Sequence, residues 1–192
     1  MNTPLHRKRY LWRIVSLLLF SVLFGHRLQA TTTPCTGVFW LETFGQSNGT
    51  TSDNGTSAWT ATTSGTGTYS VQNGEFETAF NQSAEGVWQS NVIDISGRSN
   101  ISLSVYVKSV AVGSETFEDD DYIKVYYKLN GGAETLVYQS IAGINGQTSG
   151  TKDATISASI PAGSTVQIII KTNNSDADEQ YYFDNEIGRA HV

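Results

Sequence analysis

Carboxylates and aromatic rings are the side chains of this 192-residue sequence that could do chemistry. Histidine occurs only at His6, His26 and His191, so the long central part, residues 31–185, contains none. Its absence excludes a Ser/His/Asp or Cys/His nucleophile system and any histidine-bearing metal site in that part. What remains is carboxylate chemistry and surface binding.

The net charge of residues 31–185 further limits the kinds of molecule that this part of the chain could bind. Residues 31–185 carry six Lys and Arg against seventeen Asp and Glu, a formal charge of −11. This balance makes nucleic acid and anionic membrane poor partners and cations better ones. Cys35 is the single cysteine, so an internal disulfide is impossible.

Calcium is the cation that such acids suit best, because it takes several oxygen ligands and is abundant outside cells. Glu42 lies on the first predicted strand, Asp184 on the last, and Asp53 in the loop after the first. If the first and last strands lie together, these oxygens could converge. We therefore predict a first calcium site at Glu42, Asp53 and Asp184.

Two further acidic clusters are metal candidates. The second metal site is predicted at Glu118, Asp119 and Asp121, and a third group of acids lies within residues 176–179. The alternative at each cluster is a solvated run of charge that guards the end of a strand against aggregation.

Aromatic rings offer surface binding, because Trp and Tyr can stack on sugar rings while their polar edges hydrogen-bond hydroxyls. Trp88 lies between Val87 and Gln89 in a predicted strand and is expected in the core. Trp59 follows a long loop and is expected to be exposed. Tyr122 and Tyr126 share one face of a strand with Lys128. We predict Trp59, Tyr122 and Tyr126 as ligand-binding residues.

A carboxylate pair is the one catalytic alternative that the composition leaves. Glu75 and Glu77 lie two apart on a predicted strand and so share a face, as the acid pair of a glycoside hydrolase would. Two acids on the solvated face of an amphipathic strand need no catalytic function. The prediction is a non-enzymatic module, with a glycoside hydrolase or polysaccharide lyase as the weaker alternative.

The strand that carries Tyr122 and Tyr126 organises the elements around it. Polar and aromatic residues alternate with Ile123 and Val125, which is typical of a strand with one buried face. The pair Asn130 and Gly131 then predicts a tight hairpin turn back into the apolar run 136–138.

The rest of the central part also reads as short strands separated by Gly, Ser, Asn and Asp. No sustained helical period follows the first thirty residues. We predict an all-β fold, an antiparallel β-sandwich of jelly-roll type with about ten strands. Besides the hairpin, strands are expected at 38–43, 57–63, 68–72, 75–80, 87–93, 101–110, 154–160, 166–172 and 181–184.

The first thirty residues are set apart from this fold. Basic residues precede the apolar run 14–24, and Leu28, Gln29 and Ala30 offer small-residue cleavage chemistry, which together predict a signal-peptide helix over 1–30. An uncleaved membrane anchor is the alternative, but the run is shorter than the ~20 residues a spanning helix needs. We expect a polar leader at 31–37, the sandwich at 38–185 and an exported protein with no membrane insertion after cleavage.

The heptapeptide 186–192 breaks the alternation that precedes it. The codons GAG ATC GGA AGA GCA CAC GTC would encode it, and they coincide with a widely used sequencing adapter. Our hypothesis is that residues 186–192 are a non-native tail and that the natural protein continues past Asn185. Reading the source DNA tests this, since a native stop codon after different codons would contradict it.

Several segments together resemble the jelly-roll domains of bacterial secreted and cell-surface proteins. They are similar to the galactose-binding-like and carbohydrate-binding-module superfamily and, more loosely, to MAM-type adhesion domains. The resemblance implies a non-catalytic module of a larger secreted or surface protein, with a structural calcium near Glu42 and Asp184. The segments lie at 73–78, 85–90, 93–97, 101–105, 121–132 and 182–185.

Taken together, these observations favour an extracellular or cell-surface binding module. The predicted partner is a polysaccharide or other glycan. The alternative is a calcium-stabilised structural or adhesion domain that binds a surface protein.

Overall fold

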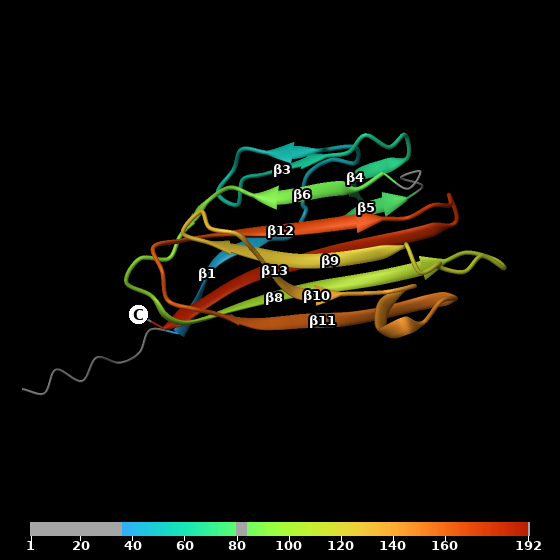
Figure 1. Cartoon of the computed structure of the whole chain (residues 1–192). Coiled ribbons are helices and arrows are strands. Elements are labelled where there is room, and N and C mark those ends of the chain that lie inside the picture. Colours follow the sequence, from blue (N-terminus) through green and yellow to red (C-terminus); the bar gives the residue numbers. More distant parts are fainter. Residues whose placement is uncertain (1–35, 80–83, 192) are drawn as a thin grey trace, which may run out of the picture. The chain divides into compact units, whose positions relative to one another are not determined.

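The computed structural model of the protein describes residues 36–79 and 84–191. These residues form thirteen strands and one short 3₁₀ turn, η1 (Ile144–Gly146), and all strand pairs are antiparallel. The strands form two sheets that pack as a sandwich (Figure 1). The all-β jelly-roll prediction is therefore confirmed. The predicted signal peptide and most of the polar leader lie outside the described residues.

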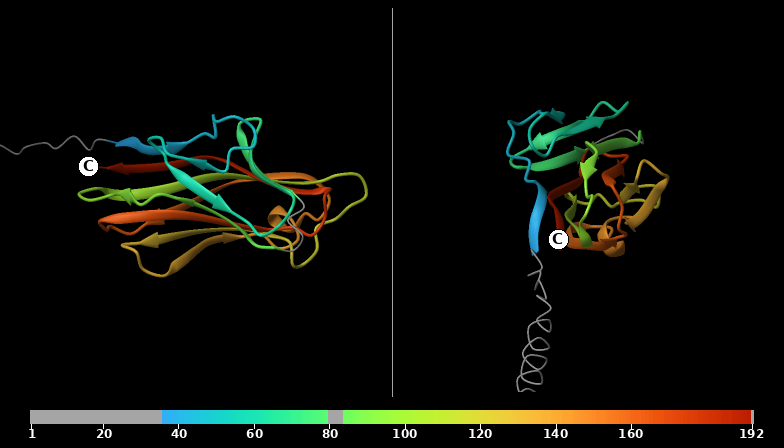
Figure 2. Two further views of the ribbon diagram at one scale, coloured as in Figure 1. Left: turned by 90° about the horizontal axis from the view of Figure 1, so that it is seen from above. Right: turned by 90° about the vertical axis from the view of Figure 1, so that its left-hand side faces the viewer.

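The first sheet has six strands and includes both the first and the last strand of the chain. Along it the order is β11 (Gly150–Ile160), β8 (Ser99–Ala111), β13 (Glu179–His191), β5 (Glu75–Ala79) and β4 (Thr68–Gln72), and β1 (Thr36–Glu42) also pairs with β13. Figure 2 shows β1, in blue, beside β13, in red. The expectation that the first and last strands lie together is met.

The second sheet has seven strands and carries the predicted hairpin. Its order is β10 (Glu134–Gln139), β9 (Tyr122–Leu129), β12 (Thr165–Asn173), β6 (Gly86–Ser90), β3 (Trp59–Thr62) and β2 (Ser52–Asp53), and β7 (Ile93–Asp94) also pairs with β12. Among the described residues, no helix has the length and apolar character that crossing a bilayer requires.

The hairpin between β9 and β10 has the turn that its sequence predicts. Asn130 and Gly131 both have positive φ angles, 52° and 69°, as a tight hairpin turn of this kind requires. The Asn130 side-chain oxygen also accepts hydrogen bonds from the backbone N–H groups of Ser164 and Thr165, at 2.8 and 3.1 Å. The turn is thereby held to the start of β12.

Aromatic rings fill the interior between the two sheets. Phe44 lies at the centre of this group, with ring centroids 5.6 to 6.0 Å from those of Trp59, Phe76, Trp88 and Phe183. All five side chains have no exposed surface. Burial of this much apolar area is the main force that holds the sheets together.

The last strand differs from the sequence prediction. The sequence predicted a strand that ends at Asp184 and a break in the pattern from residue 186, but β13 continues to His191 with a register shift between Asp184 and Ile187. The short strands β2 and β7 were also not predicted, because two residues are too few to show a period. The origin of residues 186–192 stays a prediction.

Candidate functional site

The outer side of β9 presents the predicted tyrosines. Along this strand Ile123 and Val125 point into the core with no exposed surface. Tyr122, Lys124 and Tyr126, which alternate with them, are partly exposed. The strand period of two therefore places both tyrosines on one side of the sheet, as predicted.

Neighbouring strands add charged side chains to this surface. Lys171 of β12 is paired in register with Lys124, and Glu134 of β10 with Lys128. Glu85 lies directly before β6, which pairs with β12 on its other side. We call this surface the β9 face and define it by Tyr122, Lys124, Tyr126, Lys128, Lys171, Glu85 and Glu134.

Charges on the β9 face are paired with one another. Lys171 Nζ lies 2.9 Å from Glu134 Oε2 and 3.8 Å from Glu85 Oε1, and Lys128 Nζ lies 3.7 Å from Glu134 Oε1. The Lys171 hydrogen bond lowers the pKa of Glu134, and the same bond raises the pKa of Lys171. Both groups therefore stay charged at neutral pH.

The tyrosine rings lie within this network of charge. Tyr122 donates its hydroxyl to Glu85 Oε2 at 2.6 Å, and burial, followed by Glu85, raises its pKa. Lys124 Nζ lies 3.5 Å from the Tyr122 ring centroid, and Lys171 Nζ lies 5.3 Å from that of Tyr126. Such cation–π contacts hold the rings in place at exposed sites. The β9 face thus combines ring surfaces with fixed donors and acceptors.

Trp59 does not belong to any exposed surface, so the prediction that it is exposed is wrong. Its side chain has no exposed surface and packs against Phe44, Phe76 and Trp88. Strand β3 lies inside the second sheet, between β2 and β6, and turns its first residue toward the core. A ring in that position cannot stack on a ligand from solvent. Trp88 is buried, as predicted.

The residues of the first predicted calcium site, Glu42, Asp53 and Asp184, do not have a common environment. Glu42 is buried, and its Oε1 accepts hydrogen bonds from the backbone N–H groups of Thr43 and Phe44, at 3.0 and 2.7 Å. Its Oε2 accepts from the Ser57 hydroxyl at 2.7 Å. Protein donors thus satisfy this carboxylate. They also hold the turn at Phe44, whose φ of 45° is unusual for a bulky residue.

Asp53 and Asp184 do not join Glu42 in a group of close carboxylates within the described part of the chain. Asp53 accepts a local hydrogen bond from the Gly55 N–H at 3.0 Å. Asp184 pairs in register with Tyr106 on β8, while Glu42 pairs with Glu186 beyond the register shift in β13. A calcium role for these three residues stays a prediction.

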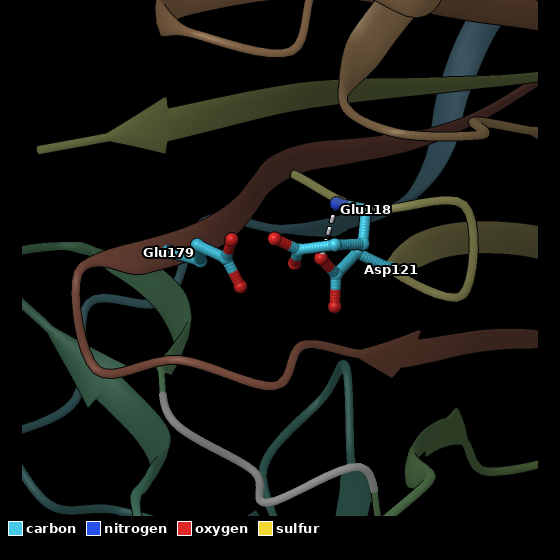
Figure 3. A group of neighbouring side chains, drawn as sticks. All are labelled: Glu118, Asp121 and Glu179. Atoms are coloured by element: carbon cyan, nitrogen blue, oxygen red, sulfur yellow. Dashed lines mark hydrogen bonds between the residues drawn. The ribbon is translucent and has the colours of Figure 1, made fainter. Parts of the chain in front are cut away.

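Glu118 and Asp121 of the second predicted metal site do lie close together, and they are joined by Glu179, which belongs to the third group of acids. Carboxylate oxygens of Glu118, Asp121 and Glu179 all lie within 4.8 Å of one another (Figure 3). Glu118 and Asp121 belong to the loop between β8 and β9, and Glu179 is the first residue of β13. We call these three residues the acid cluster. Asp119 is exposed and is not part of it.

Hydrogen bonds within the acid cluster fix most of its oxygens. Asp121 Oδ2 accepts from the Glu118 N–H at 2.7 Å, and Asp121 Oδ1 accepts from the Ser175 N–H at 3.0 Å. Glu179 Oε2 accepts from the Asp176 N–H at 3.1 Å. The burial of Asp121 and Glu179 raises the pKa of both carboxyls, and their mutual repulsion adds to the rise for Glu179.

Catalysis by the Glu75 and Glu77 pair has little support in the geometry. Glu75 forms an ion pair with Lys108, and burial raises the pKa of Glu77. The surface pocket of about 350 Å³ beside β7 is lined by residues of β1, of β7 and of nearby loops, and Asp94 is its single carboxylate. Glu75 and Glu77 are not among the residues that line this pocket.

Comparison with known proteins gives a fold and no family. No family model matches the chain, and no curated protein matches it. Among solved structures, the K3 cleaved adhesin domain of Lys-gingipain from Porphyromonas gingivalis is 11% identical, with a TM-score of 0.53 over 80% of this chain and 98% of that one. The K2 domain of Lys-gingipain is 13% identical, with a TM-score of 0.46 over 82% and 98%.

A carbohydrate-binding module is also similar: the C-terminal family 22 carbohydrate-binding module of Clostridium thermocellum Xyn10B. It is 16% identical, with a TM-score of 0.41 over 80% of this chain and 94% of that one. The likeness to the K3 domain shows the fold. The chain is a jelly-roll β-sandwich, as the sequence resemblance implies.

Proposed function

We propose that this chain is a non-catalytic binding module that takes polysaccharide or another glycan on the β9 face. The observation that carries the proposal is the pair Tyr122 and Tyr126, four residues apart on the same side of β9 and partly exposed. A strand rise of about 3.3 Å per residue sets their Cα atoms roughly 13 Å apart, so one oligosaccharide can span both rings.

The surroundings of the rings suit sugar hydroxyls. Glu85, Glu134 and Lys171 present charged oxygens and nitrogens whose partners are one another. Hydrogen bonds to charged groups are stronger than neutral ones, so a hydroxyl that enters this network gains good donors and acceptors. A sugar over Tyr122 would take the place of the Lys124 ammonium, which lies over that ring.

A protein surface is the second candidate partner. Leu136 of β10 pairs in register with Tyr126 and is 50% exposed, so an apolar side chain borders the ring. The K3 domain, whose fold this chain shares, bears the name of an adhesin domain. A calcium-stabilised adhesion domain is therefore the alternative function.

The proposal places the module outside the cell, as part of a larger secreted or surface protein. The support is the signal-peptide pattern in residues 1–30. Export has a direct test: fusing these residues to a reporter and recovering the reporter outside the cytoplasm.

Affinity electrophoresis on a panel of soluble polysaccharides tests the binding function. We expect one or more glycans to retard the protein, and Tyr126→Ala to abolish the retardation. Tyr106→Ala is the matched control, because Tyr106 is a partly exposed tyrosine on β8 in the other sheet. A protein that migrates unchanged on every glycan would overturn carbohydrate binding and favour adhesion.

A further inference from the structure

Two loops that are distant in sequence bury acids against each other. Asp121 ends the β8–β9 loop, Glu179 begins β13, and neither side chain has exposed surface. Glu118, an exposed residue of the first loop, brings a carboxylate oxygen within 4.8 Å of theirs (Figure 3). Like charges taken out of water repel strongly, so a fold keeps such a group when a cation or protons neutralise it.

No side chain of the protein supplies that positive charge in the described residues. The four ion pairs formed there use Lys108, Lys128 and Lys171, and none of them involves the acid cluster. The neighbouring donors are backbone N–H groups and the Ser175 hydroxyl, which lies 3.3 Å from Glu118 Oε2. These donors are neutral and leave the net negative charge in place.

A second and independent observation is an oxygen without a partner. The Glu179 side chain is fully buried, and its Oε1 accepts no hydrogen bond. Asn174, next to it on the β12–β13 loop, likewise has a buried Oδ1 with no partner, while its Nδ2 donates to the Glu179 carbonyl. An unsatisfied buried acceptor costs free energy, so the site is built for a group that carries positive charge.

The chemistry of the donors selects the class of ligand. All the available atoms are carboxylate and amide oxygens, which suit hard cations better than zinc or copper, whose sites in proteins also use Cys or His. Loop-borne oxygens with one exposed side leave room for water and for the irregular, higher coordination that calcium accepts. Magnesium demands a stricter octahedron.

We propose that Glu118, Asp121 and Glu179 bind a calcium ion, with Asn174 Oδ1 as a further oxygen. The ion would join the β8–β9 loop to the β12–β13 loop. Strands β9 and β12 pair directly up to Tyr122 and Asn173, so the ion sits at the end of the β9 face that carries Tyr122. This site is distinct from the one predicted at Glu42, and it stands whether or not the β9 face binds glycan.

Isothermal titration of calcium chloride into chelator-treated protein tests the site. Thermal melts with calcium and with EDTA accompany the titration. We expect saturable binding and a higher Tm with calcium for the wild type. Glu179→Gln and Asp121→Asn should weaken binding at least tenfold and remove the Tm increase. Asp119→Asn is the matched control, since it removes the same charge from an exposed position of the same loop.

Glu118→Gln covers the case in which the buried variants do not fold, because Glu118 is exposed and its loss disturbs no core packing. It too should weaken calcium binding, by about tenfold. Wild-type protein that shows no calcium heat and no Tm change at millimolar calcium would overturn the proposal. Calcium binding that is equal in the wild type and all three cluster variants would do the same.

Discussion

Lys171 of β12 and Glu134 of β10 form an ion pair of 2.9 Å across the strand that lies between them, β9. The pair passes beside Tyr126, because Lys171 Nζ also lies 5.3 Å from that ring. Three strands of the second sheet are thus joined on their outer side at the point where a ligand of the β9 face would lie.

Replacing Lys171 by Met should raise the pKa of the Glu134 carboxyl toward its ordinary value, because the Lys171 hydrogen bond is the largest cause of its lowering. A group with a lowered folded pKa contributes stability above its unfolded pKa and loses it as pH falls through the folded value. The cost at neutral pH should stay below ~1 kcal/mol, because the pair is partly exposed.

Carbon-detected NMR titration of the carboxyl in both proteins measures that pKa. Lys152→Met serves as control, since Lys152 lies on β11 in the other sheet and joins none of the ion pairs between described residues. An identical Glu134 titration in wild type and Lys171→Met would contradict the prediction.

In the presence of chelator, the free energy of unfolding should fall as pH rises. Burial raises the pKa of both Asp121 and Glu179 in the folded state, so the folded protein binds more protons than the unfolded chain. The fall begins near the ordinary carboxyl pKa of about 4 and ends above about 8, the raised value for Glu179.

Urea unfolding at a series of pH values measures this slope. Glu179→Gln should flatten the slope above about pH 6, while a slope remains at lower pH because burial also raises the pKa of Asp121, to about 6, and that of Glu77. Stability that is constant or rises over this range in the wild type would contradict the raised pKa values of Asp121 and Glu179.

Tyr122 separates the role of a ring from that of its hydroxyl. Tyr122→Phe removes the hydrogen bond to Glu85 and keeps the ring, so we expect glycan affinity to fall less than threefold, below ~0.7 kcal/mol. Tyr122→Ala removes the ring as well and should cost about tenfold, ~1.4 kcal/mol. Calorimetry with whichever glycan binds measures both. Equal losses in the two variants would assign the binding to the hydroxyl instead of the ring.

Trp59 should report on the core and not on a ligand. Trp59→Ala should destabilise the protein by about 3–5 kcal/mol, because a large buried ring is replaced by a cavity. In the wild type, acrylamide should quench the described tryptophans poorly, and glycan should leave their emission unchanged, since Trp40, Trp59 and Trp88 are all buried. A glycan-dependent shift in tryptophan emission would place the binding surface elsewhere.

The features that could be predicted from the sequence are those that depend on a few neighbouring residues. The alternation through Ile123 and Val125 assigns β9 its buried side, and Asn130 with Gly131 selects the hairpin turn, because both signals act over a few neighbouring residues. The lack of histidine in residues 31–185 depends on composition alone. The fold class, the hairpin and the exposed tyrosine row therefore followed from the sequence.

Strand pairing decided the rest, because it brings together residues that are far apart in the chain. Pairing of β9 with β12 sets Asp121 beside the β12–β13 loop, and Glu179 thereby joins Glu118 and Asp121 across more than fifty residues. A register shift in β13 separates Asp184 from the part that pairs with Glu42. Trp59 is buried in the core because β3 is an inner strand of the second sheet. The order of strands in a sheet depends on the whole chain, so no local sequence period predicts it.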